Sequence, residues 1–152
     1  MYDLLIIFCA KYLIYLPPLA LLAALYYRKR KWPFLIFSLS SLALTYALGA
    51  LASLFWYDPR PFVVENFAPL VAHAANNGFP SGHMLLAAGV ASIAFYYNRT
   101  LGLWMWLVAV IIGLARVLAG VHYAVDIFSS IAIAIASVYI VRLLFKTVHK
   151  RV

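Results

Sequence analysis

The stretch PFLIFSLSSLALTYALGALASLFWY, from Pro33 to Tyr57, runs without a single charged side chain. A helix needs about 20 apolar residues to cross a bilayer, because each residue adds about 1.5 Å of rise and the hydrocarbon core is about 30 Å thick. This stretch therefore predicts a transmembrane helix. The helices of this fold are therefore expected to be surrounded by lipid instead of water.

Apolar stretches of similar character recur along the whole chain. We expect five membrane spans, at about 4–27, 33–57, 82–97, 101–118 and 123–145. The composition agrees, since 67% of the residues are hydrophobic and only 11% are charged, against roughly a quarter charged in soluble domains. The predicted fold class is an all-α integral membrane protein, a bundle of about five transmembrane helices that forms one domain over residues 1–152.

Basic residues set the predicted orientation. They cluster at 28–31, at Arg99 and at 142–151, all on one side of a five-span bundle, and loops rich in lysine and arginine remain in the cytoplasm. The acidic residues fall at or near the other side, and they are Asp3, Asp58, Glu65 and Asp126. We expect an external N-terminus and an internal C-terminus in a plasma (inner) membrane. The net charge of +8 then reflects topology, and we expect no nucleic-acid partner because the basic residues form no continuous stripe.

Ionisable residues also gather at the external ends of the predicted spans. A charged group is costly within a membrane, so each one marks a site or a partnered group. A single histidine or arginine at a span end is ordinarily an interfacial residue, but a convergent set indicates a functional site. The set consists of Arg60, His83, Arg116, His122 and Asp126.

The spacing of this set suits phosphate chemistry. His122 and Asp126 are four residues apart and share one helix face, so the carboxylate can orient the imidazole and leave its other nitrogen free to attack. Ser81 is a good helix cap, and a helix start offers free N–H groups to a phosphate. Arg60 and Arg116 add planar, charged guanidinium groups whose paired N–H donors can bind two phosphate oxygens.

Two features of the connecting segments bear on this site. The span at 82–97 covers only about 24 Å, so we expect His83 to lie below the external surface. The long connection at 58–80 contains several prolines and the sequence Asn76-Asn77-Gly78, which interrupt a helix. Its apolar residues suit either a lid on the membrane surface or ordinary loop packing. His73 in this connection could belong to the site or not.

Three ordered motifs carry a family resemblance. They are Arg60-Pro61, then Pro80-Ser81-Gly82-His83, then Arg116 with His122 and Asp126. Together they resemble the signature motifs of the type 2 phosphatidic acid phosphatase superfamily. The segments Arg60-Pro61-Phe62-Val63 with Glu65, and His73-Ala74-Ala75 leading into Phe79-Pro80-Ser81, are similar to its bacterial undecaprenyl-diphosphatase branch.

The resemblance implies roles for individual residues. His122 would be the nucleophile that forms a phosphohistidine, Asp126 its orienter, and His83 the general acid for the leaving group. The phosphoryl oxygens would be held by Arg60, Arg116, Ser81 and the Gly82 amide.

The chain departs from the family pattern in three respects. Ser53 stands where the first motif has a lysine, Ala115 stands where serine is common, and the usual six spans are five. Lys11 lies about one third of the way along the first span, where a charge needs a partner. We hypothesise that Lys11 replaces the motif lysine as a phosphate ligand. Snorkelling of its side chain to the external face is the alternative.

These inferences predict a membrane lipid phosphatase that hydrolyses undecaprenyl diphosphate to the monophosphate on the external face. Phosphatidylglycerol phosphate and phosphatidic acid are alternative substrates, and phosphoryl transfer to an acceptor lipid is an alternative reaction. A transporter would place polar groups along the membrane depth, whereas here all except Lys11 gather at one face.

The expected partners are the lipid phosphate and the bilayer. We expect no cofactor and no metal, because the arginines already supply positive charge at the phosphate. The sequence leaves the oligomeric state open.

Overall fold

The computed structural model describes residues 2–28 and 31–149. Apart from an isolated β-bridge between Pro59 and Asn77, its regular structure over these residues is helical, as predicted. The elements are α1 (Tyr2–Lys11), the 3-10 turn η1 (Leu13–Tyr15), α2 (Leu16–Tyr26), α3 (Lys31–Phe55), α4 (Pro61–Val64), α5 (Gly82–Tyr97), α6 (Arg99–Leu118) and α7 (Ala124–His149).

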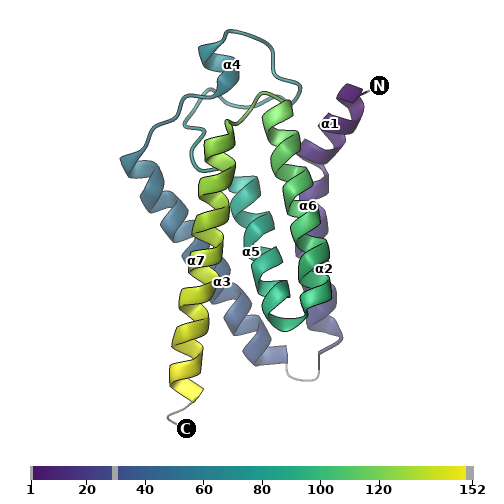
Figure 1. Ribbon diagram of the computed structural model, residues 1–152, viewed down its shortest axis with the longest axis vertical. Helices are drawn as coiled ribbons and strands as arrows, with labels where there is room; N and C mark the ends of the chain where they lie inside the picture. Colours follow the sequence, from purple (N-terminus) through teal and green to yellow (C-terminus); the bar gives the residue numbers. More distant parts are fainter. Residues whose placement is uncertain (1, 29–30, 150–152) are drawn as a thin grey trace.

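Four helical segments of the described chain have the length and composition to cross a membrane. They are Tyr2–Tyr26, Lys31–Phe55, Arg99–Leu118 and Ala124–Lys146. The apolar helix α5 is shorter, with 16 residues, and Figure 1 shows it among the longer helices. It packs against α6, α7, α3 and α2. The predicted all-α membrane fold of about five transmembrane helices is confirmed, with four to five apolar helices in the described chain.

The first span is divided into α1, η1 and α2. Pro17 and Pro18 lack the amide N–H groups that would bond to the carbonyls of Leu13 and Ile14 in a continuous helix. The chain instead tightens into the 3-10 turn just before them. This break places the carbonyl end of α1 beside α6, against which α1 packs.

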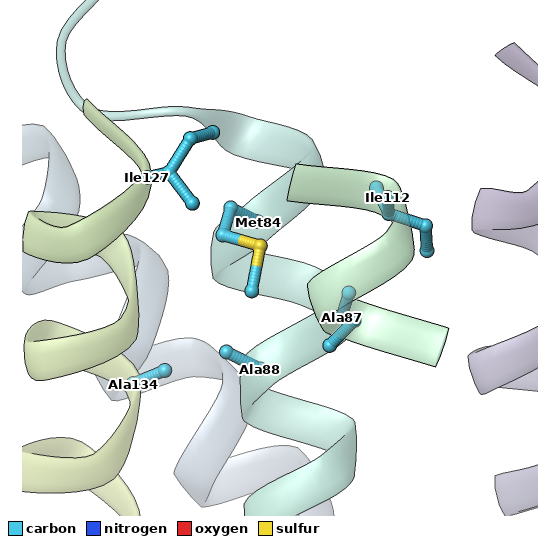
Figure 2. Close-up of a cluster of buried hydrophobic side chains, with 7 residues drawn as sticks. Met84, Ala87, Ala88, Ile112, Ile127 and Ala134 are labelled. Atoms are coloured by element: carbon cyan, nitrogen blue, oxygen red, sulfur yellow. The ribbon is translucent and has the colours of Figure 1, made fainter. Parts of the chain in front are cut away.

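Small residues let the central helices approach closely. Figure 2 shows Ala87 and Ala88 of α5 beside Met84 and Ile112, all completely buried. Gly102 of α6 leaves no room for a side chain, since an added Cβ would lie 2.2 Å from the Cα of Phe95. Small residues at helix contacts are typical of membrane bundles. The packing fixes the start of α5 relative to the end of α6 and the start of α7.

The segment 58–80 lies over the end of the bundle where α5 and α7 begin (Figure 1). The Leu70 amide donates to the Ala119 carbonyl at 3.1 Å, and the Phe67 ring packs on Gly120, whose φ of +74° suits glycine. The Gly78 amide donates to the Asp58 carbonyl at 2.8 Å and joins the two ends of the segment. These contacts anchor it to the junction between α6 and α7.

Candidate active site

His122 and Asp126 form a buried pair at the start of α7. Nδ1 of His122 lies 3.1 Å from Oδ2 of Asp126, and the side chains are 3% and 0% exposed. The amide of Tyr123 donates to the same oxygen at 3.0 Å. Because the carboxylate only accepts hydrogen bonds, Nδ1 carries the imidazole proton and Nε2 keeps its lone pair.

Arg60 faces the free nitrogen of this histidine. Its Nη1 lies 3.3 Å from Nε2 of His122 and donates to the Val121 carbonyl at 2.8 Å. A guanidinium has only donors, so Nε2 must accept, which agrees with the tautomer set by Asp126.

The environment favours the neutral form of His122. Burial lowers the pKa of His122 from its ordinary value of 6.5, the Asp126 hydrogen bond opposes this effect, and the charges of Arg116 and Arg60 lower the pKa further. At neutral pH the imidazole is therefore uncharged and its Nε2 atom is nucleophilic.

Two asparagines of the 58–80 segment hold Arg60 in place. Nε of Arg60 donates to Oδ1 of Asn76 at 3.1 Å, and Nη2 donates to the Asn77 carbonyl at 3.3 Å. The Asn77 side chain accepts from the amides of Asp58 and Phe79 and donates to the Trp56 carbonyl at 3.0 Å. The sequence identified these asparagines only as helix breakers, because nothing in their spacing points to Arg60.

Arg116 and Ser81 carry buried donor atoms that lack a partner within the described part of the chain. Arg116 is 2% exposed, and its Nη1 donates to the Ala10 carbonyl at 3.3 Å. Its Nε and Nη2 atoms, like the Ser81 hydroxyl oxygen, have no hydrogen-bond partner among the described residues. Buried polar groups are nearly always hydrogen-bonded, so such a group of donors suits an anionic ligand.

The start of α5 differs in one respect from the prediction. Ser81 occupies the position before the first turn, but its side chain makes no capping hydrogen bond. Its carbonyl instead accepts from the Ser130 hydroxyl at 3.2 Å, and Ser130 also bonds to the Asp126 carbonyl at 2.6 Å. Ser130, which the sequence analysis missed, thus ties the start of α5 to the helix that carries Asp126. Gly82 is exposed, with open space at its Cα.

Both remaining histidines near this end approach the pair. His83, in the first turn of α5, is partly buried and interacts electrostatically with Arg116, His122 and His73. The His73 ring centroid lies 6.2 Å from that of His122, with the ring planes at 75°. Burial lowers the pKa of His73 to about 4, and the charges of Arg60 and Arg116 contribute. His73 therefore lies beside the site as a neutral ring.

Lys11 directly follows Ala10, whose carbonyl accepts the Arg116 hydrogen bond. It is exposed at the end of α1, and its Nζ lies 5.2 Å from the centroid of the Tyr12 ring. The Ser53 hydroxyl donates to the Ala50 carbonyl at 2.7 Å within α3. The role of Lys11 as a phosphate ligand stays a prediction.

A cavity of about 590 Å³ opens beside His122. It lies between the 58–80 segment and the junction of α6 and α7, and its lining includes Phe67, Leu70, Leu118 and Gly120. Leu118 is 56% exposed on the outer face of α6. The cavity therefore joins the apolar surface of the bundle to the histidine.

Comparisons with known proteins agree with this geometry. Undecaprenyl-diphosphatase BcrC of Bacillus subtilis is 33% identical over 88 residues, 58% of this chain and 46% of that protein. The bacitracin transport permease protein BcrC of Bacillus licheniformis is 28% identical over 133 residues, 86% of this chain and 65% of that protein. The chain thus spans about half to two thirds of the length of these relatives.

The crystal structure of Aquifex aeolicus LpxE matches with a TM-score of 0.75 and 26% identity, over 91% of this chain and 85% of that one. Residues 34–150 match the PAP2 superfamily, which includes every residue of the candidate site except Lys11. This chain belongs to the PAP2 superfamily.

Proposed function

We propose that this protein is a membrane lipid phosphatase that hydrolyses undecaprenyl diphosphate to the monophosphate through a phosphohistidine intermediate. One observation carries the proposal. A neutral His122, with its Nδ1 proton bound by Asp126, interacts electrostatically with Arg116, whose buried Nε and Nη2 atoms have no hydrogen-bond partner among the described residues. His122 is thus an oriented nucleophile, and the Arg116 donors can bind the oxygens of a phosphoryl group.

In the first step, Nε2 of His122 attacks the terminal phosphorus and the bond to the bridging oxygen breaks. His83, which must enter this step as the imidazolium, donates its proton to that oxygen and becomes neutral, so the lipid monophosphate leaves. Asp126 stabilises the positive charge that develops on the His122 ring. Arg60 can transfer its Nη1 hydrogen bond from Nε2 to a phosphoryl oxygen, while Arg116, Ser81 and the Gly82 amide bind the others.

The second step returns the enzyme to its starting state. A water molecule attacks the phosphohistidine, and His83, now deprotonated, accepts a proton from it. The phosphorus–nitrogen bond breaks, inorganic phosphate leaves, and His122 regains its Nε2 lone pair.

A polyprenyl diphosphate fits the surroundings of the site. The identity to the undecaprenyl-diphosphatase relative supports this class of substrate. The cavity beside His122 is lined by exposed Leu118 of α6, so a lipid tail can stay in the bilayer while its terminal phosphate reaches His122. The shortness of α5 supports the same reading, since it recesses His83 toward the depth of a lipid head group.

The direct test is phosphate release by purified protein in detergent. We expect undecaprenyl diphosphate to be hydrolysed with a higher kcat/KM than phosphatidylglycerol phosphate or phosphatidic acid, and His122→Ala to release no phosphate. A preference for either glycerolipid would keep the phosphatase chemistry and reject this substrate. Movement of a substrate across liposomes without hydrolysis would favour a transporter.

We also propose that the site faces the outside of the plasma membrane, with the C-terminus in the cytoplasm. The basic residues at the opposite end of the bundle support this orientation. A cysteine introduced at Asn76 in a Cys9→Ala background should react with a membrane-impermeant maleimide in intact cells. A reporter fused to the C-terminus should read as cytoplasmic, and an external C-terminus would contradict the orientation.

We keep the proposal that Lys11 serves as a phosphate ligand in place of the motif lysine. Lys11→Met should then lower kcat/KM strongly without loss of folding, and Lys11→Met combined with Ser53→Lys should recover part of the activity. Full activity of Lys11→Met would show that the lysine snorkels and that Arg60 and Arg116 suffice.

A further inference from the structure

A groove of about 290 Å³ lies on the outside of the bundle, between α5, α6 and α7. Its lining residues come from the second half of α5, the first half of α6 and the middle and second half of α7, and they include Ser92, Trp106 and Arg142. The candidate active site lies at the other ends of these same helices. Ser81 and Tyr96 are separated by about 22 Å of helical rise, so the groove is distinct from that site.

Arg142 is the charged residue of this groove. The guanidinium carbon lies 4.9 Å from the centroid of the Tyr96 ring, and the buried Nε atom has no hydrogen-bond partner among the described residues. Arginine keeps its charge in proteins, and a charge that borders lipid is costly without a counter-charge. An anionic hydrogen-bond acceptor at Nε of Arg142 would satisfy both the donor and the charge.

Ser92 provides a second donor in the same groove. Its buried hydroxyl has no hydrogen-bond partner among the residues that the structure describes. Four other hydroxyls of this bundle, unlike those of Ser41 and Ser81, donate to the carbonyl four residues earlier, and they are Ser38, Thr45, Ser130 and Ser137. Ser92 makes no such bond, so its proton is available to a ligand.

The rest of the lining is apolar or aromatic. Ile135 and Val138 lie one to two turns before Arg142 on α7, toward the middle of the bundle, and Trp106 faces the groove from α6. A ligand that fits must have an anionic group at the Arg142 end and a hydrocarbon chain extending toward the bilayer centre.

The basic residues at this end of the bundle also favour an anionic ligand with a hydrocarbon chain. Arg28, Lys31, Arg99 and Lys146 lie near the helix ends on this side. All the acidic residues of the chain, Asp3, Asp58, Glu65 and Asp126, precede or open the helices at the other end. Among the described residues, no Asp or Glu side chain therefore lies at this end to neutralise Arg142. Basic pockets between membrane helices are suited to anionic lipid head groups.

We propose that this groove binds an anionic phospholipid from the leaflet opposite the candidate active site. The lipid phosphate accepts hydrogen bonds from Nε of Arg142 and from the Ser92 hydroxyl. One acyl chain packs against Trp106, Ile135 and Val138. The lipid is a bound structural partner and not a substrate, so this proposal is independent of the proposed phosphatase activity.

Trp106 allows a local test. A variant with Trp32, Trp56 and Trp104 changed to Phe retains Trp106 as its only tryptophan. In nanodiscs, lipids with brominated acyl chains quench a tryptophan that they contact. We expect phosphatidylglycerol to quench Trp106 at about tenfold lower mole fraction than phosphatidylcholine with identical chains. A substrate or product lipid in the candidate active site, at the other end of the bundle, would not produce this signal.

Arg142→Gln should remove this preference, and Ser92→Ala should reduce it severalfold. Arg99→Gln is the matched control, because Arg99 is an exposed basic residue at the same end outside the groove, and it should retain the preference. If Arg142→Gln does not fold, Arg142→Lys keeps the charge but loses the Nε donor, and it should weaken the preference. Equal quenching by the two lipids, or equal effects of the Arg142 and Arg99 changes, would overturn the proposal.

Discussion

Nη1 of Arg60 lies 3.3 Å from Nε2 of His122, the nitrogen that we propose attacks phosphorus. The contact brings together a residue before α4 and a residue before α7. The contact has two consequences. Because a guanidinium only donates hydrogen bonds, Nε2 of His122 must accept. The guanidinium also lies where it can bind an oxygen of the phosphoryl group that His122 attacks. The position of Arg60 in turn depends on Asn76 and Asn77.

Asn76→Ala should therefore lower kcat/KM by about tenfold with little change in stability. The substitution removes the Oδ1 acceptor of Arg60 Nε, and because Asn76 itself is exposed, water can replace that acceptor. Steady-state kinetics and thermal unfolding in detergent would measure both effects. Asn76→Asp, which keeps an acceptor, should recover most of the activity. A structural role alone would lower stability and leave kcat/KM of the folded protein unchanged.

His122→Ala should abolish turnover and the acid-labile phosphoenzyme, a loss on the order of 10³-fold or more. No other side chain of the site combines a free ring nitrogen with an orienting carboxylate. His83→Ala should lower activity greatly on a lipid diphosphate but much less on an aryl phosphate, whose leaving group needs no proton. Near-normal activity of His122→Ala would reject the assignment of the nucleophile.

Asp126→Asn should lower kcat by about 10²- to 10⁴-fold, because an amide can hold the imidazole in the wrong tautomer. It should also move the acidic limb of the pH profile. In the parent protein, the acidic limb of kcat/KM should lie below pH 6.5, since the pKa of His122 is lowered. The Asp126 hydrogen bond opposes that shift, so its loss should move the limb to lower pH. An unchanged limb would show that another group limits the rate.

Stability should also depend on pH through His73. The pKa of His73 is about 4 in the folded protein, against an ordinary value of 6.5. Between these values the unfolded chain binds more protons, so stability should be complete above pH 6.5 and fall as pH decreases toward 4. Thermal unfolding across this range would measure the slope. His73→Gln should reduce the slope, and an identical slope would contradict the burial of a neutral ring.

Activity should persist in EDTA, because Arg60 and Arg116 supply the positive charge that a metal would otherwise provide. Vanadate, which mimics five-coordinate phosphorus, should inhibit by occupying the arginine site. Phosphate release with and without each reagent would measure this. Complete loss of activity in EDTA, restored by magnesium or zinc, would argue against the mechanism.

Much of this protein follows from local sequence features. Apolar length predicts the membrane helices, because each span must satisfy its backbone hydrogen bonds internally in lipid. The spacing of His122 and Asp126 predicts their hydrogen bond, because residues four apart meet on one helix face. The five-span prediction likewise places Arg60, Ser81, His83 and Arg116 at one end of the bundle.

Other contacts depend on how the helices pack. Arg116 bonds to the Ala10 carbonyl, 106 residues away, only because the first span breaks before Pro17 and α1 packs on α6. The fold of the 58–80 segment alone decides that Asn76 holds Arg60 and that His73 faces His122. Such contacts join distant parts of the chain without any periodic pattern. Their geometry is set by tertiary packing, which local spacing does not encode.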